Sequence, residues 1–330
     1  NRATGESRSI RPPQTEGASH RYNWNSPILM SQHDPRVIYF AGNKLFKSFN
    51  RGDDWLEISG DLTTADPDRI AGNVPHCTIT TIAESKKDKN RLLVGTDDGK
   101  VQITLDGGEN WTDLTDHFPF RPPNWWCSRV EFATDDKDTA YASFTGYRED
   151  DFRPFLFKTT DAGQTWESIS SNLPEGPVNV VKQDPENPST LYVGTEFGVF
   201  ISLDQGKQWH ALDQGLPRVS VQDLLVHPRD GDLVIGTHGR GIFVMDSVAP
   251  FQHFDAEQQD RPQLYPVQNR ARIARTNSSM FAGDRKRLAP SPPAGVPIWY
   301  QLPKTVEEED FSLVVKNAEG KEVGNLTGSR

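Results

Sequence analysis

The sequence has few cysteines and no long hydrophobic run. Two cysteines in 330 residues, Cys77 and Cys127, are too few for a disulfide framework or for a zinc site. No apolar stretch approaches the roughly 20 residues that a membrane-spanning helix needs. Residues 1–19 also lack the apolar core of a signal peptide, and the chain does not begin with methionine, so we expect a processed chain or a fragment.

An excess of basic residues is also absent. The chain has 36 Lys and Arg against 46 Asp and Glu, which gives a formal net charge of -10. Because a protein that binds nucleic acid needs a basic face against the phosphates, nucleic acid is not an expected partner. The sequence contains no phosphate-binding loop, nucleophile motif or cluster of metal ligands, so we expect neither a cofactor nor a metal.

A turn pattern that occurs four times is the clearest feature of the sequence. Each copy has a hydroxyl residue, any residue, Asp or Asn, any residue, Gly, two further residues and Trp. An Asp or Asn side chain can accept hydrogen bonds from backbone amides two residues on, and Gly adopts a positive φ without strain. Apolar runs flank every copy, which predicts a strand, a tight turn and a second strand that begins at the Trp. The positions that build the four turns are Asn50, Gly52 and Trp55; Asp106, Gly108 and Trp111; Asp161, Gly163 and Trp166; and Asp204, Gly206 and Trp209.

Two further strand-like runs, separated by a polar turn, precede each copy. A fifth pair of runs continues into residues 241–246 without a copy of its own. With the strands on either side of the turn, each unit contains four strands, and successive Trp residues are 56, 55 and 43 positions apart, the repeat length of a propeller blade with insertions. The paired runs are 26–31 and 37–42, 78–84 and 91–95, 128–134 and 139–143, 178–183 and 190–194, and 219–227 and 232–236.

These patterns predict an all-β chain. The apolar spacing is two rather than 3.6, and the turns are rich in Gly and Asp, which excludes a helical solenoid. We expect a β-propeller of four-stranded blades over residues 21–246, about five of them in this chain, after an extended lead-in over residues 1–20. A Pro- and Arg-rich linker packed on the propeller (247–294) and the first strands of an immunoglobulin- or fibronectin-like β-sandwich (295–330) should follow.

The four turns resemble the Asp-box, or BNR, repeats of propellers such as sialidases, xyloglucan-cleaving glycosidases and sortilin/VPS10 receptors. Residues 95–99, 193–200, 227–230 and 236–243 look most like large secreted bacterial proteins with a sortilin-like, glycosyl-hydrolase-like propeller. The resemblance covers residues 21–246 and implies a secreted, periplasmic or cell-surface protein. Such propellers usually have more than five blades, so it also implies further blades from the same or another chain.

Propeller geometry places the long insertions on one face. Loops that join the second strand to the third, or one blade to the next, lie opposite the repeated turns, and residues 60–76, 116–126 and 145–154 are such loops. We call this side the insertion face; its exposed aromatic and charged residues can stack on sugars or hold a peptide. The candidate binding residues are Tyr22, Trp24, His76, Asp98, Trp125, Trp126, Arg129, Glu131, Tyr147, Arg148, Glu196, His238 and Arg240.

Structural explanations compete with binding at several of these positions. Trp125 and Trp126 also suit core packing between blades. Asp98 and Glu196 also suit hairpin turns, because Gly lies beside them, and Arg240 also suits a tie between the last blade and its neighbour. Arg129 and Glu131 either face the channel or pair with each other. Cys77 and Cys127 begin equivalent strands of adjacent blades, so a disulfide between them is a further possibility.

Two functions are compatible with the sequence. The favoured one is a noncatalytic extracellular or cell-envelope propeller that binds a protein, peptide or polysaccharide, or that serves as a subunit of a larger assembly. The alternative is a glycoside hydrolase, xyloglucanase- or sialidase-like, which needs two carboxyl groups about 5 to 10 Å apart or several converging arginines. No motif selects catalytic residues; the candidate carboxylates are Asp98, Glu131, Asp150, Asp151 and Glu196, and the candidate arginines are Arg129, Arg148 and Arg240.

Overall fold

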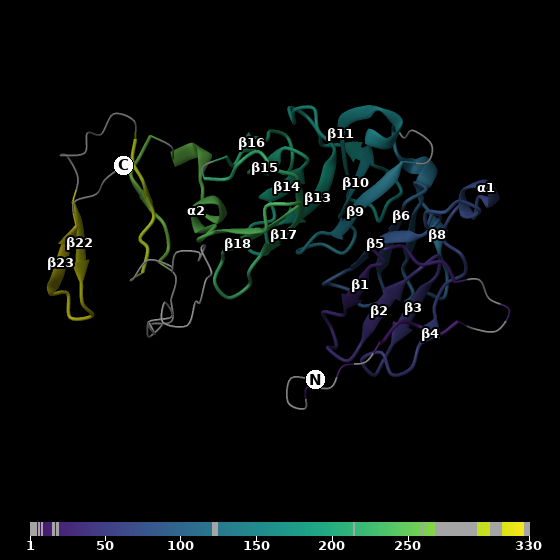
Figure 1. Cartoon of the computed structure of the whole chain (residues 1–330). Coiled ribbons are helices and arrows are strands. Elements are labelled where there is room, and N and C mark those ends of the chain that lie inside the picture. Colours follow the sequence, from purple (N-terminus) through teal and green to yellow (C-terminus); the bar gives the residue numbers. More distant parts are fainter. Residues whose placement is uncertain are drawn as a thin grey trace, which may run out of the picture. The chain divides into compact units, whose positions relative to one another are not determined.

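The computed structural model describes residues 5, 7, 9–14, 17, 20–120, 125–213, 215–258, 260–267, 296–303 and 312–326. Nearly all of the regular structure in these ranges is β-strand (Figure 1), as the sequence predicts. The chain forms two compact units, Asn1–Pro228 with Asp232–Asp246, and Arg229–Gly231 with Ser247–Arg330. Within the described residues, no helix is both long enough and apolar enough to cross a membrane.

Four antiparallel sheets of four strands follow one another along the chain, and we call them blades 1 to 4 (Figure 1). In each blade the strands are ordered as in the sequence, so the predicted four-stranded unit is confirmed. Blade 1 comprises β1 (Ile28–Met30), β2 (Ile38–Ala41), β3 (Leu45–Ser48) and β4 (Leu56–Glu57); blade 2 comprises β5 (Ile79–Glu84), β6 (Leu92–Thr96), β7 (Val101–Thr104) and β8 (Thr112–Asp113). Blade 3 comprises β9 (Trp126–Phe132), β10 (Ala140–Gly146), β11 (Asp151–Thr159) and β12 (Glu167–Ser168); blade 4 comprises β13 (Val178–Gln183), β14 (Leu191–Thr195), β15 (Gly198–Ser202) and β16 (His210–Ala211).

The fifth sheet, blade 5, differs from the others. It contains β17 (Val221–Val226), β18 (Leu233–Thr237) and β19 (Ile242–Met245), and it has three strands among the described residues rather than the predicted four. The sequence explains the difference, because the turn that leads into a fourth strand in the other blades is missing after β19.

The hydrophobic core lies between consecutive blades. Alternate residues of a strand point to opposite faces of a sheet, so blades 2 to 4 each pack one face on the preceding blade and the other on the following blade. The second strands show this most clearly: every residue of β6 and of β14 is buried. Tyr39, Tyr141 and Tyr192 occupy the same register position in blades 1, 3 and 4 and are fully buried, with a hydrogen bond from Tyr39 Oη to Glu84 of blade 2 at 3.0 Å.

The four repeated turns share one set of hydrogen bonds. In blade 2 the hydroxyl of Thr104 donates to Asp106 Oδ1 (2.7 Å) and accepts from the amide of Gly108 (3.0 Å), and Asp106 Oδ1 accepts from the amide of Asn110 (2.9 Å). The sequence predicts that the Asp accepts from the amide two residues later, but it accepts from the amide four residues later. The amide two residues later, that of the glycine, donates to the hydroxyl instead. The predicted positive φ is present at Gly52, Gly108, Gly163 and Gly206, between 87° and 107°.

The repeated turns of blades 2 to 4 also pack against the preceding blade. A Cβ placed on Gly108 would lie 2.9 Å from Ile58 Cβ, and one placed on Gly206 would lie 2.9 Å from Ile169 Cβ, so only glycine fits. Leu114 fills the same place before Gly163. The turn therefore stabilises the contact between blades as well as its own hairpin.

The second unit contains short β pairs. β20 (Gln263–Leu264), from the predicted linker, pairs with β21 (Tyr300–Gln301), and β22 (Leu313–Lys316) pairs with β23 (Glu322–Leu326) through a turn at Gly320 (φ 78°). This unit also holds the short helix α2 (Ala249–Gln252). Residues 268–295, most of the predicted linker, lie outside the described residues, and the sandwich stays a prediction.

Candidate binding surface

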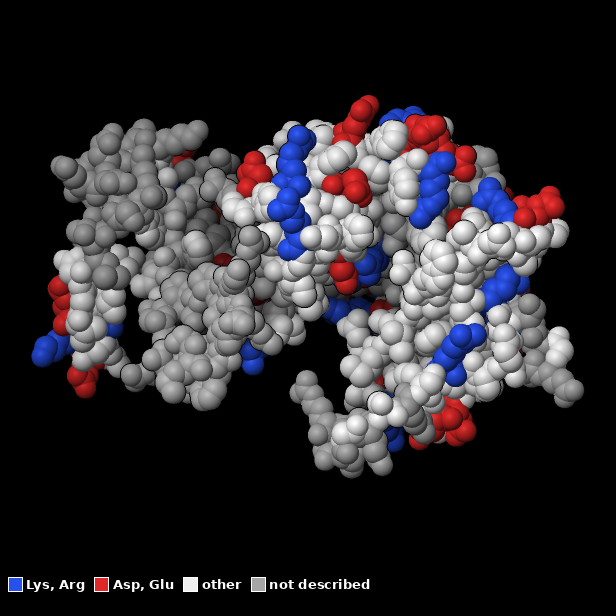
Figure 2. Space-filling model, in the orientation of Figure 1, with Lys and Arg blue, Asp and Glu red and all other residues white. Residues whose placement is uncertain are grey.

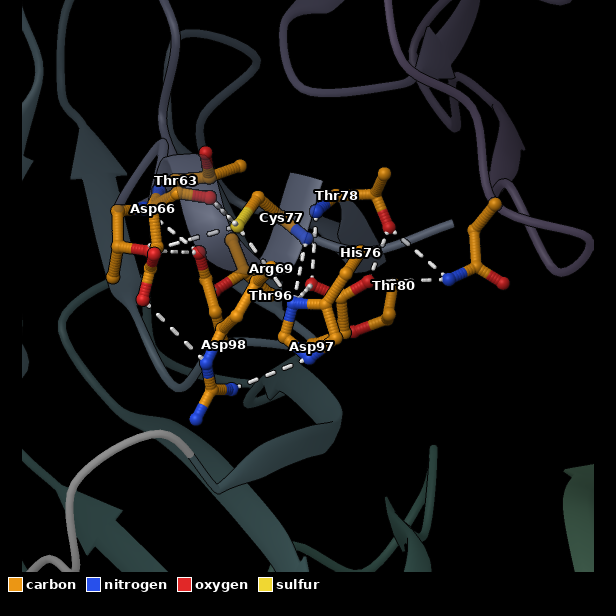
Figure 3. A network of polar contacts seen from close by, with 12 residues as sticks. Thr63, Asp66, Arg69, His76, Cys77, Thr78, Thr80, Thr96, Asp97 and Asp98 are labelled. Carbon is orange, nitrogen blue, oxygen red and sulfur yellow. Dashed lines mark hydrogen bonds and ion pairs between the residues drawn. The ribbon is translucent and has the colours of Figure 1, made fainter. Parts of the chain in front are cut away.

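The insertion of residues 60–76, which includes helix α1 (Pro67–Ile70), is held by two buried aspartates of the β6–β7 turn (Figure 3). Asp98 accepts hydrogen bonds from the amide and hydroxyl of Thr64 at 2.8 and 2.6 Å. Asp97 accepts from the amide of Thr78 at 2.9 Å and from Asn23 Nδ2 at 3.2 Å. Burial raises the pKa of Asp97. Of the two explanations open for Asp98, the structural one fits, because its side chain is enclosed.

His76 and Cys77 end this insertion. Cys77 has a positive φ of 56°, and its Sγ lies 3.7 Å from both His76 Nδ1 and Thr64 Oγ1 (Figure 3). His76 Nδ1 accepts the amide hydrogen of Cys77 at 2.9 Å, and Arg69 Nη1 lies 3.3 Å from His76 Nε2. Burial raises the pKa of the Cys77 thiol to about 11. A neutral, buried thiol is a poor nucleophile, so these contacts serve to anchor the insertion.

The two cysteines do not form a disulfide. Both Cys77 and Cys127 are free and buried. The Cys127 side chain packs against Gly95 of blade 2, where a Cβ would come within 2.3 Å of Sγ. Cys127 is thus a small apolar group between blades, and burial raises the pKa of its thiol as well.

Aromatic rings and arginines gather on the insertion face of blades 3 and 4. The guanidinium of Arg148 lies over both Trp126 and Tyr147, 4.4 and 4.5 Å from the ring centroids. Arg153 lies 5.2 Å from the ring centroid of Phe120 and belongs to the same group. We name the whole set the aromatic–arginine surface; it comprises Phe120, Trp126, Tyr147, Arg148, Phe152, Arg153, Phe197 and Arg218.

Gly176 lies between two members of this surface. Its backbone amide donates to the carbonyl of Phe152 at 2.8 Å, and a Cβ placed on it would lie 2.9 Å from Phe197 Cδ2. Arg218 lies 5.9 Å from the ring centroid of Phe197. Tyr147, Phe120, Phe152 and Phe197 are 44%, 52%, 51% and 46% exposed. Exposed aromatic residues that gather on one face mark a candidate interaction surface.

The structure separates the predicted aromatic residues into two groups. Trp125 is buried in the core with its ring 4.2 Å from that of Phe155, so it is unavailable to a ligand. Tyr22 packs on Phe40 of blade 1, and Trp24 is 79% exposed. Only Trp126 and Tyr147 of the predicted aromatic residues belong to the aromatic–arginine surface.

The segment of residues 145–154 is more regular than the loop that the sequence predicts. β10 and β11 extend through most of it, with Gly146 paired to Asp151, and only a short turn at Tyr147–Glu149 joins them. Sequence reasoning did not name Arg218; an arginine beside a turn in the loop that leads into the next blade is only a weak signal.

Arg129 and Glu131 lie on the innermost strand of blade 3, beside a cavity of about 240 Å³ that β1, β5 and β9 line. They do not pair with each other. Arg129 Nη2 is 2.8 Å from Asp223 of blade 5, and Glu131 is 2.7 Å from Lys182 of blade 4. These pairs join the inner strands, and basic and acidic side chains are likewise mixed over the described part of the face in Figure 2.

The remaining predicted residues lie in turns. Glu196 accepts a hydrogen bond from the Ser220 hydroxyl at 2.9 Å. His238 and Arg240 are exposed in the β18–β19 turn, where the amide of His238 donates to the carbonyl of Ser220 at 2.9 Å. This turn contains Gly239 and Gly241, both with positive φ. The exposed side chains of His238 and Arg240 are free to meet a ligand beside blade 5.

Four of the five candidate carboxylates of a glycosidase, those of Asp98, Glu131, Asp151 and Glu196, have partners. Asp151 is 2.6 Å from Arg153, whose hydrogen bonds lower the pKa of that carboxyl. Asp98 and Glu131 are bound as described above, and Asp150 follows Glu149 with a φ of 56°. A general acid of a glycosidase needs a raised pKa beside open space, whereas Asp97, whose pKa burial raises, is enclosed. Among the described residues no group of three or more His, Cys, Asp or Glu is placed to hold a metal ion.

Comparisons with known proteins identify the fold. No family model matches the sequence, and a search of curated proteins gives no match. The chain is similar to a GH74 enzyme from Niastella koreensis, with a TM-score of 0.51 and 14% identity over 69% of this chain and 36% of that one. It is also similar to the GH74 xyloglucanase from Xanthomonas campestris, with a TM-score of 0.50 and 21% identity over 70% of this chain and 37% of that one.

A third structure, an ancestral GH74 enzyme, is similar with a TM-score of 0.50 and 19% identity over 66% of this chain and 28% of that one. The chain therefore spans well under half of the length of each of these three enzymes. At such identities the likeness shows the fold alone, and that fold is a β-propeller.

Proposed function

We propose that this chain is part of a noncatalytic propeller that binds a protein, peptide or polysaccharide through the aromatic–arginine surface. The observation that carries the proposal is the position of the Arg148 guanidinium over the rings of both Trp126 and Tyr147, with Tyr147 exposed. A secreted, periplasmic or cell-surface location and the Asp-box, sortilin-like kinship belong to the same proposal, since they rest on the resemblance of residues 21–246.

The chemistry of this surface suits a partner with apolar groups next to acidic ones. A guanidinium that stacks on aromatic rings keeps its N–H edges free to donate to a carboxylate or sulfate. Trp, Tyr and Arg are also enriched among the few residues that supply most of the binding energy of protein interfaces. Sugar rings of an acidic polysaccharide would use the same exposed ring faces.

Binding assays on matched variants test the proposal. The chain would be screened against arrays of acidic and neutral peptides and against acidic and neutral polysaccharides, and ligands found would be titrated by calorimetry. Tyr147→Ala and Arg148→Ala should each weaken binding by about tenfold or more, as for a residue worth roughly 1.4 kcal/mol or more in an interface. Phe49→Ala is the control, because Phe49 is 59% exposed but lies in a repeated turn. Equal losses in all three variants would refute a role for this surface.

The glycoside hydrolase alternative has a separate test. Release of reducing ends from xyloglucan or of sialic acid from a sialoside would establish it. Activity that Glu131→Gln or Asp151→Asn abolishes, with binding retained, would overturn the noncatalytic proposal. Full retention of activity in both variants would trace it to a contaminant or to other carboxylates.

A further inference from the structure

Blade 5 exposes the face that the other blades bury. We call the face of a blade that packs on the following blade its leading face, and the opposite face its trailing face. We call the place of the Ser or Thr that begins each repeated turn, such as Ser202 of blade 4, the hydroxyl position. Ser202 of β15 pairs with Leu191, the first residue of β14, and Met245 of β19 pairs with Leu233, the first residue of β18. Met245 therefore occupies the hydroxyl position of blade 5. This alignment allows each leading-face position to be compared between blades.

The comparison shows a missing neighbour. Three residues before the hydroxyl position, the side chain is 0–2% exposed in blades 1 to 4, at Leu45, Val101, Leu156 and Val199. In blade 5 the same position is Ile242, which is 72% exposed. One residue before the hydroxyl position, Ile201 of blade 4 is 3% exposed, whereas Val244 of blade 5 is 56% exposed. The sequence of blade 5 therefore retains the apolar leading face of a blade that has a successor.

Blade 1 exposes the complementary face. Met30, Phe132, Gln183 and Val226 share one trailing-face position, because each pairs with the first residue of the neighbouring second strand. Met30 is 61% exposed, whereas these three residues are 4%, 6% and 8% exposed, and Glu84 at the same position of blade 2 is 4% exposed. Ile28, two residues earlier, is 53% exposed, while Val130 and Val181 at its position are fully buried.

The lead-in residues add a second, independent observation. Ile10 packs against Gly52 of blade 1, with a distance of 2.9 Å from Ile10 Cβ to a Cβ placed on Gly52. In the other blades this place is taken by the residue that follows the fourth strand of the preceding blade, such as Ile58 before Gly108. The lead-in thus follows the path that the end of a fourth strand takes in the other blades. Among the described residues, β19 has no fourth strand beside it.

We propose that the leading face of blade 5 docks on the trailing face of blade 1 of a second copy of this chain, head to tail. The contact repeats the one already present between consecutive blades, with Ile242 and Val244 of one copy against the Met30 side of the other. Ser9 of the second copy would run beside β19, just before its own Ile10 enters Gly52. This inference is independent of ligand binding by the aromatic–arginine surface.

Light scattering on the eluted chain tests the proposal. At micromolar concentration the wild-type chain should have at least twice the mass of one copy, because a head-to-tail contact gives a ring of two copies where its rotation closes and an open series where it does not. Ile242→Asp should reduce the species to one copy by placing a charge in the apolar contact. Val74→Asp is the matched control, since Val74 is 58% exposed but lies in the 60–76 insertion, and this variant should keep the wild-type mass.

A mixing experiment separates this contact from any other dimer. Met30→Asp alone should also give a single copy. This variant keeps an intact leading face on blade 5, and the Ile242→Asp variant keeps an intact trailing face on blade 1. Equal amounts of the two variants should therefore form a mixed species of two copies through one contact. A series of higher species that Ile242→Asp abolishes would support the contact without closure. A wild-type monomer, or an oligomer unchanged in both variants, would overturn the proposal.

Discussion

The indole Nε1 of Trp111 donates a hydrogen bond of 3.0 Å to the carbonyl oxygen of Ile58, which lies on the preceding blade. Trp209 makes the same bond to Ile169 at 2.8 Å. The residues that accept these bonds are also the ones that fill the space in front of the turn glycines. These repeated turns therefore hold two consecutive blades together, and the tryptophan joins hairpins that are far apart in sequence.

Removing an indole N–H should have different effects in two blades. Trp209→Phe deletes the bond to Ile169 and leaves a buried carbonyl without its donor, at a cost of about 1–3 kcal/mol beyond the lost packing. Trp166 Nε1 is buried without an acceptor among the described residues, so Trp166→Phe should lose packing only. Urea unfolding of both variants measures the difference. Equal destabilisation would mean that the bond between blades contributes nothing.

Two adjacent glycines separate backbone strain from steric clash. Gly107 and Gly108 both have positive φ, at 81° and 107°. A Cβ on Gly108 would lie 2.7 Å from the Ile58 carbonyl oxygen, whereas the nearest atom to one on Gly107 is 3.5 Å away. Gly107→Ala should cost about 1 kcal/mol for strain, and Gly108→Ala about 2–4 kcal/mol because the clash adds to it. Thermal or urea unfolding measures both losses of stability. A smaller loss for Gly108→Ala than for Gly107→Ala would contradict the tight packing of Gly108 on Ile58.

In the repeated turns of blades 1 and 2, which we call turn 1 and turn 2, Asn and Asp occupy opposite ends of one side-chain hydrogen bond. Asn50 Nδ2 donates to Asp54 Oδ2 at 2.8 Å, whereas Asn110 Nδ2 donates to Asp106 Oδ2 at 2.7 Å. Asn110→Asp alone should lower the stability because two carboxylates then face each other, and Asp106→Asn alone should lower it because an uncharged amide oxygen replaces the carboxylate as acceptor. The double variant restores the pairing of turn 1 and should recover most of that loss. Additive losses in a double-mutant cycle would show that the pair does not interact.

Turn 2 should also show a defined pH dependence. The backbone amide of Asn110, its side-chain amide and the Thr104 hydroxyl donate to Asp106 and lower the pKa of this carboxyl from 3.8 to about 2. A folded-state pKa below the unfolded one gives stability that is present above the unfolded pKa and is lost as the pH falls through the folded one. The wild-type advantage over Asp106→Asn should therefore shrink between about pH 4 and pH 2. Unfolding titrations of both proteins across this range measure it, and a constant gap would refute the assignment.

Most strands could be predicted because their signals are local. The run predicted over residues 78–84 is β5 at Ile79–Glu84, and the run over 178–183 is β13 at Val178–Gln183. Alternation of side chains and the Asp, Gly and Pro of the intervening turns are properties of a few neighbouring residues. The aromatic–arginine surface could be predicted only in part, because the stacking of Arg148 on Trp126 joins the turn between β10 and β11 to the start of β9, and sequence spacing does not place these residues in contact.

The sequence by itself determined the four turns and the strands on either side, because their hydrogen bonds join residues at most four positions apart. Only the tertiary structure decided which apolar residues are core. Val199 and Ile242 stand at the same position of their blades, yet one is 2% and the other 72% exposed. Burial depends on whether another blade lies against the sheet, and no local pattern contains that information.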